Sequence, residues 1–338
     1  MIKIRYNNYM KNKLLQILDQ HQDCYISGEE ISQNLHVSRM AISKQIRKLI
    51  EQGYQIEAST KKGYCFSSTN DLLKKEEIVD TLQSFFYDIE IMDVTSSTND
   101  YLKSIVNTKK EGYVCIADQQ LKGKGRNGRS FYSPKQKGIY MSFLLKPTLS
   151  IYESLKITAC ASVGLWEAIM KNYQIPSKIK WVNDIFIEEK KIGGILCEAS
   201  LEMNTAKMDY MIVGIGVNVH KQSFTKELKT IAGSIEEFTD NTVSRNQLIQ
   251  DILNSFYKYY NEIEENTFLP IYKKYSSILH KHIIVYEKNH SYPAKVLDIN
   301  ENANLIVRKE DGSTHTINSG EVSVRNKKDT DGNIIVFK

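Results

Sequence analysis

The chain has 338 residues, 41% hydrophobic and 25% charged, which fits a globular protein of two or three domains. No run of eighteen apolar residues predicts a membrane span, and no apolar stretch near the start predicts a signal peptide. Five widely spaced cysteines without a CxxC pair disfavour a disulfide framework or a zinc site, so we expect reduced thiols, a cytoplasmic location and no membrane partner.

The positive charge is concentrated at the N-terminus. Residues 1–70 hold ten Lys and Arg against six Asp and Glu, whereas the remaining residues hold 35 against 34, for a net charge of +5 overall. Because phosphate groups attract such a region, nucleic acid is a reasonable partner for it.

Three helices and a hairpin are predicted in this basic region. Leucine and isoleucine spacing predicts a helix over 13–20. Ser27, with Glu30 three residues later, is a capping box for a second helix, and Ser38 caps a third that Gly53 ends. The third helix is expected to bury four apolar residues at helical spacing, namely Ile42, Ile46, Leu49 and Ile50. Short strands over 55–58 and 64–66 follow, joined by a lysine-containing turn.

This order of elements resembles the winged helix-turn-helix of bacterial transcription regulators, in which the second helix of the motif enters the major groove. His36 stands where the turn often has glycine, and histidine tolerates the left-handed conformation. The resemblance implies DNA contacts from the outer face of the helix and from the hairpin tip, namely Ser38, Arg39, Ser43, Lys44, Arg47, Lys61 and Lys62. The alternative is a small helical domain whose solvated face happens to be basic.

Domain boundaries are predicted from composition. A polar break at 67–71 predicts a linker, so the first domain is 1–68 and a larger one follows over 69–275. The larger domain is expected to contain helices over 76–86, 153–173 and 244–266, and strands over 112–118, 139–145, 178–181, 185–187, 191–196 and 211–219. Five short alternating runs then predict a small β-barrel over 276–338.

A loop at 123–129, Gly-Lys-Gly-Arg-Asn-Gly-Arg, alternates glycines with cations. Such a loop brings backbone N–H groups and charges close to an anion. Its spacing approximates a dinucleotide fingerprint and a P-loop, but both require a helix to follow, and here Pro134, Gly138 and a strand follow. Taken alone, the loop is as consistent with a solvated basic loop as with an anion site.

Five motifs occur in order: Ser-Thr-Asn at 97–99, the glycine loop between Gln120 and Phe131, Lys-Trp-Val-Asn-Asp at 180–184, Lys-Ile-Gly-Gly-Ile-Leu-Cys-Glu at 191–198 and Gly-Ile-Gly-Val-Asn at 214–218. In this order they resemble bacterial biotin protein ligases and, with the winged helix in front, the bifunctional ligase–repressor form. The resemblance covers nearly the whole chain. It implies an α+β fold with a class II synthetase-like central domain built on a mixed sheet.

The resemblance also implies the activity. The family uses ATP and Mg²⁺ to convert biotin to biotinyl-5′-AMP, and transfers biotin to a lysine of a biotin carboxyl carrier protein of the acetyl-CoA carboxylase type. It represses transcription in response to biotin, binding an inverted-repeat operator as a homodimer when the adenylate is bound. No side-chain cluster predicts a metal site, so Mg²⁺ is expected to arrive with ATP.

Residue roles follow from the matched motifs. The implied catalytic residues are Lys191, Arg126 and Asp184, with Asp184 orienting or deprotonating the incoming amine. The implied biotin contacts are Ser97, Thr98, Asn99, Gln120, Lys124, Gly125, Arg126 and Lys191. The implied ATP and adenylate contacts are Arg126, Arg129, Phe131, Lys191 and Asn218. Lys124 stands where the family usually has Arg, and Val182 where it has Pro.

Without the resemblance, Lys190 and Lys191 are a solvated turn and Asp184 is a strand-end cap. Two alternatives stay open at this point. One is a ligand-sensing transcription factor without ligase activity, and the other is a lipoate-type ligase with the same fold and chemistry.

Overall fold

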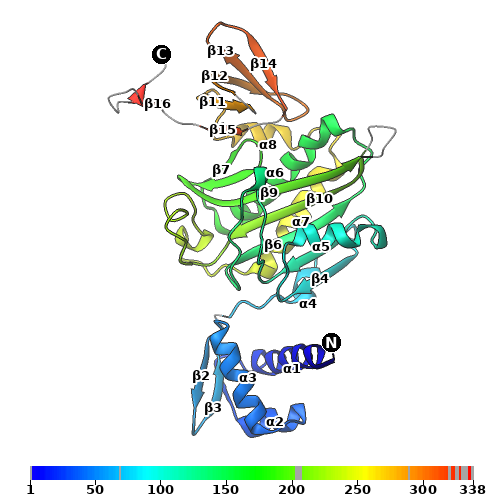
Figure 1. The fold of residues 1–338 in the computed structure, drawn as a ribbon, viewed down its shortest axis with the longest axis vertical. Helices are drawn as coiled ribbons and strands as arrows, with labels where there is room; N and C mark the ends of the chain where they lie inside the picture. The colour runs from blue at the N-terminus through cyan, green and yellow to red at the C-terminus, as the bar shows by residue number, and fades with distance from the viewer. Residues whose placement is uncertain are drawn as a thin grey trace. The chain divides into compact units, whose positions relative to one another are not determined.

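The computed structural model describes residues 2–67, 70–201, 208–287, 290–318, 321–323, 327–328 and 334–335. The chain divides into two compact units, Met1–Leu72 and Leu73–Lys338, which are described separately (Figure 1). Among the described residues, no helix has the length and apolar character needed to cross a membrane. All five cysteines are free thiols.

The first unit contains three helices and a three-stranded antiparallel sheet in the order β1-β3-β2. Its elements are α1 (Ile2–Asp19), β1 (Tyr25–Ile26), α2 (Gly28–Leu35), α3 (Arg39–Glu51), β2 (Ile56–Ser59) and β3 (Gly63–Phe66). The predicted helices and hairpin are confirmed. Two features differ from the prediction: α1 begins eleven residues earlier than 13, and β1, too short to show alternation, was missed.

Local hydrogen bonds explain where α2 and α3 begin. Ser27 Oγ accepts from Glu30 N at 3.0 Å, and Ser38 Oγ accepts from Ala41 N at 3.2 Å. Between the helices, His36 adopts the left-handed conformation at φ 52° and ψ 42°, as the sequence predicts. These contacts fix the tight turn of the helix-turn-helix motif.

The apolar core of the first unit joins α1, α2, α3 and the sheet, and contains Leu14, Leu18, Ile26, Ile31, Ile42, Ile46, Leu49 and Phe66. The prediction for Ile50 is wrong, because this side chain is 41% exposed. Leu49 and Tyr54 are both buried and already fill the core at this end of α3. Ile50 is therefore left in the solvent-facing last turn.

The second unit is built on a seven-stranded mixed sheet in the order β4-β5-β6-β10-β9-β8-β7, in which only β4 and β5 are parallel. The strands are β4 (Asp88–Met92), β5 (Tyr113–Ala117), β6 (Gly138–Leu145), β7 (Ser177–Lys180), β8 (Asp184–Ile187), β9 (Lys190–Leu201) and β10 (Met208–Asn218). The helices are α4 (Lys75–Val79), α5 (Thr98–Ile105), α6 (Ser154–Tyr173), α7 (Arg245–Asn261) and α8 (Leu269–Lys274), with short 3-10 turns η1 (Val106–Thr108), η2 (Arg126–Gly128), η3 (Ile151–Glu153) and η4 (Ile235–Glu237).

Helices cover both faces of this sheet (Figure 1). Along β5, Val114 and Ile116 pack with α6 and α7, whereas Tyr113 and Cys115 pack with Leu102 of α5. Successive side chains of a strand point to opposite faces, so a strand buried on both faces has a continuous apolar sequence.

Helix α4 is shorter than predicted. It ends at Val79 because Asn254 of α7 bonds the next stretch of backbone, accepting from Gln83 N at 3.0 Å and donating to Thr81 O at 3.0 Å. A partner distant in the sequence thus ends the helix, and no local pattern indicates it.

The C-terminal part is a five-stranded antiparallel sheet in the order β14-β13-β12-β11-β15. Its strands are β11 (His282–Glu287), β12 (His290–Ile299), β13 (Leu305–Lys309), β14 (Thr314–Ile317) and β15 (Glu321–Ser323), followed by the pair β16 (Lys327–Lys328) and β17 (Ile334–Ile335). All five predicted strands are present. In the described parts of the chain no pairing joins β14 to β15, so a closed barrel, like the boundary at 275, stays a prediction.

Candidate active site

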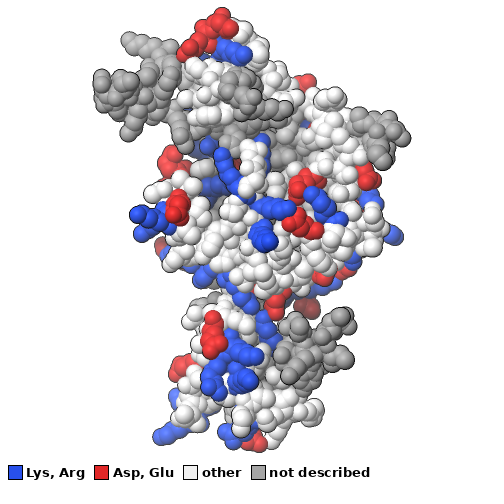
Figure 2. Space-filling model, viewed as in Figure 1, with Lys and Arg blue, Asp and Glu red and all other residues white. Residues whose placement is uncertain are grey.

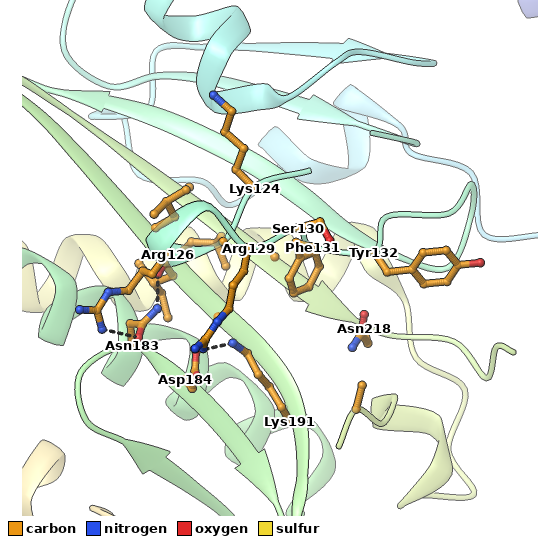
Figure 3. A pocket seen from close by; sticks show the side chains of 18 of the residues that line it. Lys124, Arg126, Arg129, Ser130, Phe131, Tyr132, Asn183, Asp184, Lys191 and Asn218 are labelled. Carbon is orange, nitrogen blue, oxygen red and sulfur yellow. Dashed lines mark hydrogen bonds and ion pairs between the residues drawn. The ribbon is translucent and has the colours of Figure 1, made fainter. Parts of the chain in front are cut away.

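One cavity of about 660 Å³ collects the residues that the sequence assigns to biotin and ATP. It lies over β8, β9 and β10 and is bordered by the start of α5, the glycine loop and the segment after β10 (Figure 3). All twelve assigned residues line it, namely Ser97, Thr98, Asn99, Gln120, Lys124, Gly125, Arg126, Arg129, Phe131, Asp184, Lys191 and Asn218. The fold therefore brings the five motifs together at one site.

The glycine loop is a narrow lobe between β5 and β6, with no helix after it. Phe131 N donates to Gly123 O at 2.8 Å, and Gly125 N donates to Arg129 O at 2.7 Å, which closes the lobe at its base. At the tip, Asn127 has a left-handed φ of 56°. This geometry differs from a phosphate nest fixed on a helix and suits a flap over a ligand.

Cationic side chains gather at one end of the cavity. Lys191 Nζ lies 2.6 Å from Asp184 Oδ1, and the side chains of Arg129 and Lys191 converge on this carboxylate (Figure 3). Arg126 Nη1 donates to Asn183 Oδ1 at 3.3 Å. With three cations and one carboxylate, this end of the cavity carries net positive charge, which favours an anionic ligand.

The other end of the cavity is polar and neutral. Gln120 Oε1 accepts from Thr98 N at 2.8 Å and lies 3.2 Å from Thr98 Oγ1. Ser142 Oγ lies 2.6 Å from Asn99 Oδ1 and 2.7 Å from Thr98 Oγ1. Uncharged donors and acceptors of this kind recognise a neutral polar head group.

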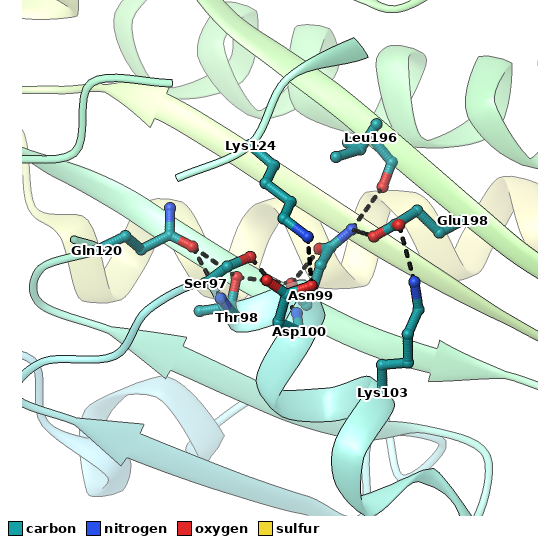
Figure 4. A network of polar contacts seen from close by, with 10 residues as sticks. Ser97, Thr98, Asn99, Asp100, Lys103, Gln120, Lys124, Leu196 and Glu198 are labelled. Atoms are coloured by element: carbon teal, nitrogen blue, oxygen red, sulfur yellow. Dashed lines mark hydrogen bonds and ion pairs between the residues drawn. The ribbon is translucent and has the colours of Figure 1, made fainter. Parts of the chain in front are cut away.

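Lys124 belongs to the neutral end of the cavity. Its Nζ pairs with Asp100 Oδ1 at 2.5 Å, so the side chain reaches α5 and points away from Arg126 and Lys191 (Figures 3 and 4). The ion pair holds the lysine against α5, and its implied contact with biotin stays a prediction.

The glycines of Gly-Ile-Gly-Val-Asn form the floor, because side chains above them need the space. A Cβ at Gly214 would lie 2.1 Å from Asn99 Oδ1, and a Cβ at Gly216 would lie 2.8 Å from Cε1 of Phe131. Both glycines therefore permit close approach of a ligand-facing side chain to the sheet.

Replacing Gly214 with Ala is expected to weaken biotin binding. The added methyl group pushes the Asn99 carboxamide out of place at a cost of roughly 1–3 kcal/mol, or about tenfold to a hundredfold in Kd. Isothermal titration with biotin measures this change. Gly28→Ala is the matched control, since its nearest neighbour atom would lie at an ordinary 3.4 Å. Unchanged affinity in Gly214→Ala contradicts the expectation.

Sequence reasoning gave no role to several residues at the site. Ser142 and Glu198 contact Asn99 from β6 and β9. Ser142 left a signal, as a small polar residue among the apolar residues of β6, and Glu198 is the last residue of the fourth motif but was given no role. The segment after β10 and strand β11 also contribute lining side chains, among them Phe224, Leu228, Ile231 and Tyr286.

The residues assigned to DNA all lie on the first unit, where lysine and arginine side chains cluster on one face (Figure 2). Ser38, Arg39, Lys44, Arg47, Lys61 and Lys62 are exposed, and Ser43 is partly exposed. Along α3, Ser43, Lys44 and Arg47 form one stripe with Met40, which is 80% exposed and was not assigned from the sequence.

Two of these cations already have partners within the unit. Arg39 Nη1 pairs with Glu29 Oε2 at 3.3 Å, and Lys62 Nζ lies 5.2 Å from the ring centre of Tyr25. These contacts hold the ends of the basic surface close to α2 and β1. Lys44 and Arg47 lie in the middle of α3, and both side chains are exposed.

Comparisons with known proteins match both units. The profile of the Biotin/lipoate A/B protein ligase family matches residues 91–218, and that of an HTH domain matches residues 11–65, which defines a ligase with an attached DNA-binding domain. The bifunctional ligase/repressor BirA of Bacillus spizizenii is 32% identical over 311 residues, and that of Bacillus subtilis is 31% identical over 311; each match covers 90% of this chain and 95% of the relative.

The fold comparison agrees. A biotin protein ligase from Aquifex aeolicus, solved in complex with biotin and ATP, has a TM-score of 0.61 and 27% identity over 70% of this chain and 97% of that one. This chain belongs to the bifunctional ligase/repressor BirA family. The lipoate-type ligase loses support because the match to these relatives spans both units. The sensor without ligase activity loses support because the relatives are named as both ligase and repressor.

Proposed function

We propose that this protein joins biotin to ATP as biotinyl-5′-AMP and then transfers biotin to a lysine of a biotin carboxyl carrier protein of the acetyl-CoA carboxylase type. The observation that carries the proposal is a single cavity with a neutral polar end at Thr98, Asn99 and Gln120 and a cationic end at Arg126 and Lys191. Biotin has a neutral ureido ring and a carboxylate at its two ends, so it spans such a cavity with its carboxylate among the cations.

In the first step, a biotin carboxylate oxygen attacks the α-phosphorus of ATP. The new C–O–P bond forms as the bond to pyrophosphate breaks, and negative charge collects on both oxygens. Lys191, Arg126 and Arg129 neutralise this charge, and fixed donors of this kind are each worth about a hundredfold to a thousandfold in rate. Holding two anions together also requires the glycine loop to exclude water from the cavity.

In the second step, the amine of the carrier lysine attacks the biotinyl carbonyl carbon, an amide forms and AMP leaves. Asp184 is the base for this step. Its carboxylate pairs with Lys191 at 2.6 Å, and an anionic adenylate competes for Lys191. One oxygen of Asp184 then orients the incoming amine and accepts its proton.

Mg²⁺ enters with the nucleotide. No group of three or more His, Cys, Asp or Glu side chains suited to a metal occurs among the described residues. The ion keeps most of its ligands from phosphate and water, so one or two protein oxygens suffice. Asn218 lines the cavity wall, and its amide oxygen, which accepts from Gln222 Nε2 at 3.4 Å, has a second lone pair that would suit an ion arriving bound to ATP. The ion supplies neutralising charge to the phosphates.

The enzymatic proposal is tested by incubating the protein with biotin, ATP and Mg²⁺. We expect pyrophosphate release that depends on biotin and, when a carrier domain is added, a biotin mass on its lysine. Lipoate in place of biotin should give neither product. Absence of pyrophosphate release with folded protein and both substrates would sink the proposal.

The first unit is proposed to bind operator DNA as one half of a homodimer. A single winged helix reads one half-site, so two copies require an inverted repeat. We expect the adenylate to promote the dimer, since ordering the glycine loop alters a surface beside the cavity. Sedimentation with and without adenylate tests this coupling, and the same association state in both samples contradicts it.

Arg47→Ala should weaken DNA binding in a salt-dependent way. Loss of one phosphate contact is expected to lower the slope of log affinity against log salt by about one and to act on all sequences alike. Fluorescence anisotropy over a salt series measures it. Lys146→Ala, an exposed lysine of the second unit, is the matched control. A slope that stays unchanged in Arg47→Ala removes this side chain from the DNA contact.

A further inference from the structure

The carboxamide of Asn99 is held on three sides at the neutral end of the cavity (Figure 4). Asn99 is 4% exposed. Its Nδ2 donates to Glu198 Oε2 at 2.8 Å and to the Leu196 carbonyl oxygen at 3.3 Å. Its Oδ1 accepts from Ser142 Oγ at 2.6 Å. Three of the four hydrogen-bonding positions of the group are therefore occupied by protein.

These partners determine which end of the carboxamide faces which way. The two ends of an asparagine amide have nearly the same shape, so only hydrogen-bond partners distinguish them. A carboxylate and a carbonyl oxygen only accept, which forces Nδ2 of Asn99 toward β9. The oxygen is left beside Ser142 and above Gly214, with one lone pair still available.

Glu198 remains an acceptor because it stays ionised. Burial disfavours its charge, but hydrogen bonds from Asn99 and Lys103 overcome this effect and lower the pKa of the carboxyl below its usual value. Lys103 Nζ lies 2.9 Å from Glu198 Oε1. Asn99 and Lys103 are four residues apart on α5, so both reach the same carboxylate from one face of the helix.

We infer that Glu198 is a positioning residue for ligand choice, because it makes Asn99 present a hydrogen-bond acceptor to the cavity. A head group with N–H donors, such as the ureido ring of biotin, satisfies that acceptor. A dithiolane ring, as in lipoate, has no donor and leaves the acceptor unpaired. The inference rests on the proposed function and deepens it by naming what selects the ureido group.

The test compares biotin with its two N-methylated ureido isomers by isothermal titration. Wild-type protein is expected to bind the less favoured isomer at least tenfold more weakly than biotin. Glu198→Met removes the acceptor for Asn99 Nδ2 and frees the amide to rotate. We expect biotin affinity to fall about tenfold to a hundredfold. The ratio of the biotin affinity to the affinity for that isomer should fall below threefold, and ATP affinity should change less than twofold.

Glu198→Gln keeps only one acceptor oxygen, for which Asn99 and Lys103 compete, so we expect its affinity ratio between biotin and the isomer to lie between those of wild type and Glu198→Met. Equal losses for biotin and both isomers in Glu198→Met, with the ratio retained, would mean a purely structural role and overturn the inference. Unchanged biotin affinity would overturn it as well.

A second variant keeps the inference testable if Glu198→Met fails to fold. Ser142→Ala removes the donor beside Asn99 Oδ1 while keeping Glu198, so the orientation and the ratio should persist even as biotin affinity falls. A ratio that collapses in Ser142→Ala overturns the assignment to Glu198. Wild-type protein that binds ATP but no biotin refutes the proposed function itself. This result differs from those that overturn only the role of Glu198, in which the wild-type protein still binds biotin.

Discussion

Lys191→Met is expected to reduce biotinyl-adenylate formation by about a hundredfold to a thousandfold. Lys191 lines the cavity. In the proposed function it supplies positive charge where the biotin carboxylate and the α-phosphate meet. Methionine keeps the length of the side chain and removes only the charge and its donors. The loss should appear in the rate of pyrophosphate release at saturating biotin and ATP, because the interaction strengthens as charge develops.

Lys190→Met is the matched control for this change. Lys190 is the adjacent residue on β9, and its Nζ donates to the Lys229 carbonyl oxygen at 2.5 Å, outside the cavity lining. We expect its rate to stay within threefold of wild type. Equal rates for the two variants, or a larger loss in Lys190→Met, would show that the position of the essential lysine is misassigned.

Arg245→Met is expected to lower the free energy of unfolding by about 3–5 kcal/mol. Arg245 is fully buried at the start of α7, and its Nη1 donates to Asp118 Oδ1 at 2.8 Å and to the Gly138 carbonyl oxygen at 3.2 Å. Asp118 and Gly138 are the two ends of the segment that carries the glycine loop. Removing the guanidinium leaves the buried Asp118 carboxylate with a more distant cation, Lys135 Nζ at 4.0 Å from Oδ2.

Scanning calorimetry measures this effect as a fall of roughly 10 °C in the Tm of the second unit. Lys75→Met breaks an ion pair of similar length, Lys75 to Asp88 at 2.6 Å, between side chains that are nearly half exposed. Such surface pairs contribute less than about 1 kcal/mol, so this control should shift Tm by no more than about 3 °C. Similar shifts in the two variants would contradict a role for Arg245 in holding the loop.

Much of the fold could be predicted because its signals are local. The caps at Ser27 and Ser38 and the left-handed His36 depend on neighbours within a few residues. Part of what the sequence did not indicate depends on distant partners. Helix α4 stops where Asn254 of α7 meets its backbone. The exposure of Ile50 has a different cause, because its near neighbours Leu49 and Tyr54 already occupy the core.

The site shows the same division. Each motif is a short continuous run of sequence, so its residues could be assigned to biotin and ATP from the sequence alone. Every residue assigned in this way lines one cavity. The contacts among them are tertiary. Lys191 pairs with Asp184 across the hairpin of β8 and β9. Asn99, on helix α5, donates to Glu198 on strand β9, about a hundred residues later in the sequence. Glu198 ends the fourth motif, but nothing in the sequence indicates that its carboxylate accepts from Asn99.

The most direct test of the central claim is mass spectrometry of the small molecules released by denaturing the protein after incubation with biotin, ATP and Mg²⁺. We expect biotinyl-5′-AMP at close to one molecule per chain, absent when biotin is omitted and strongly reduced in Lys191→Met. Protein that binds both biotin and ATP yet releases only the unreacted substrates would contradict it.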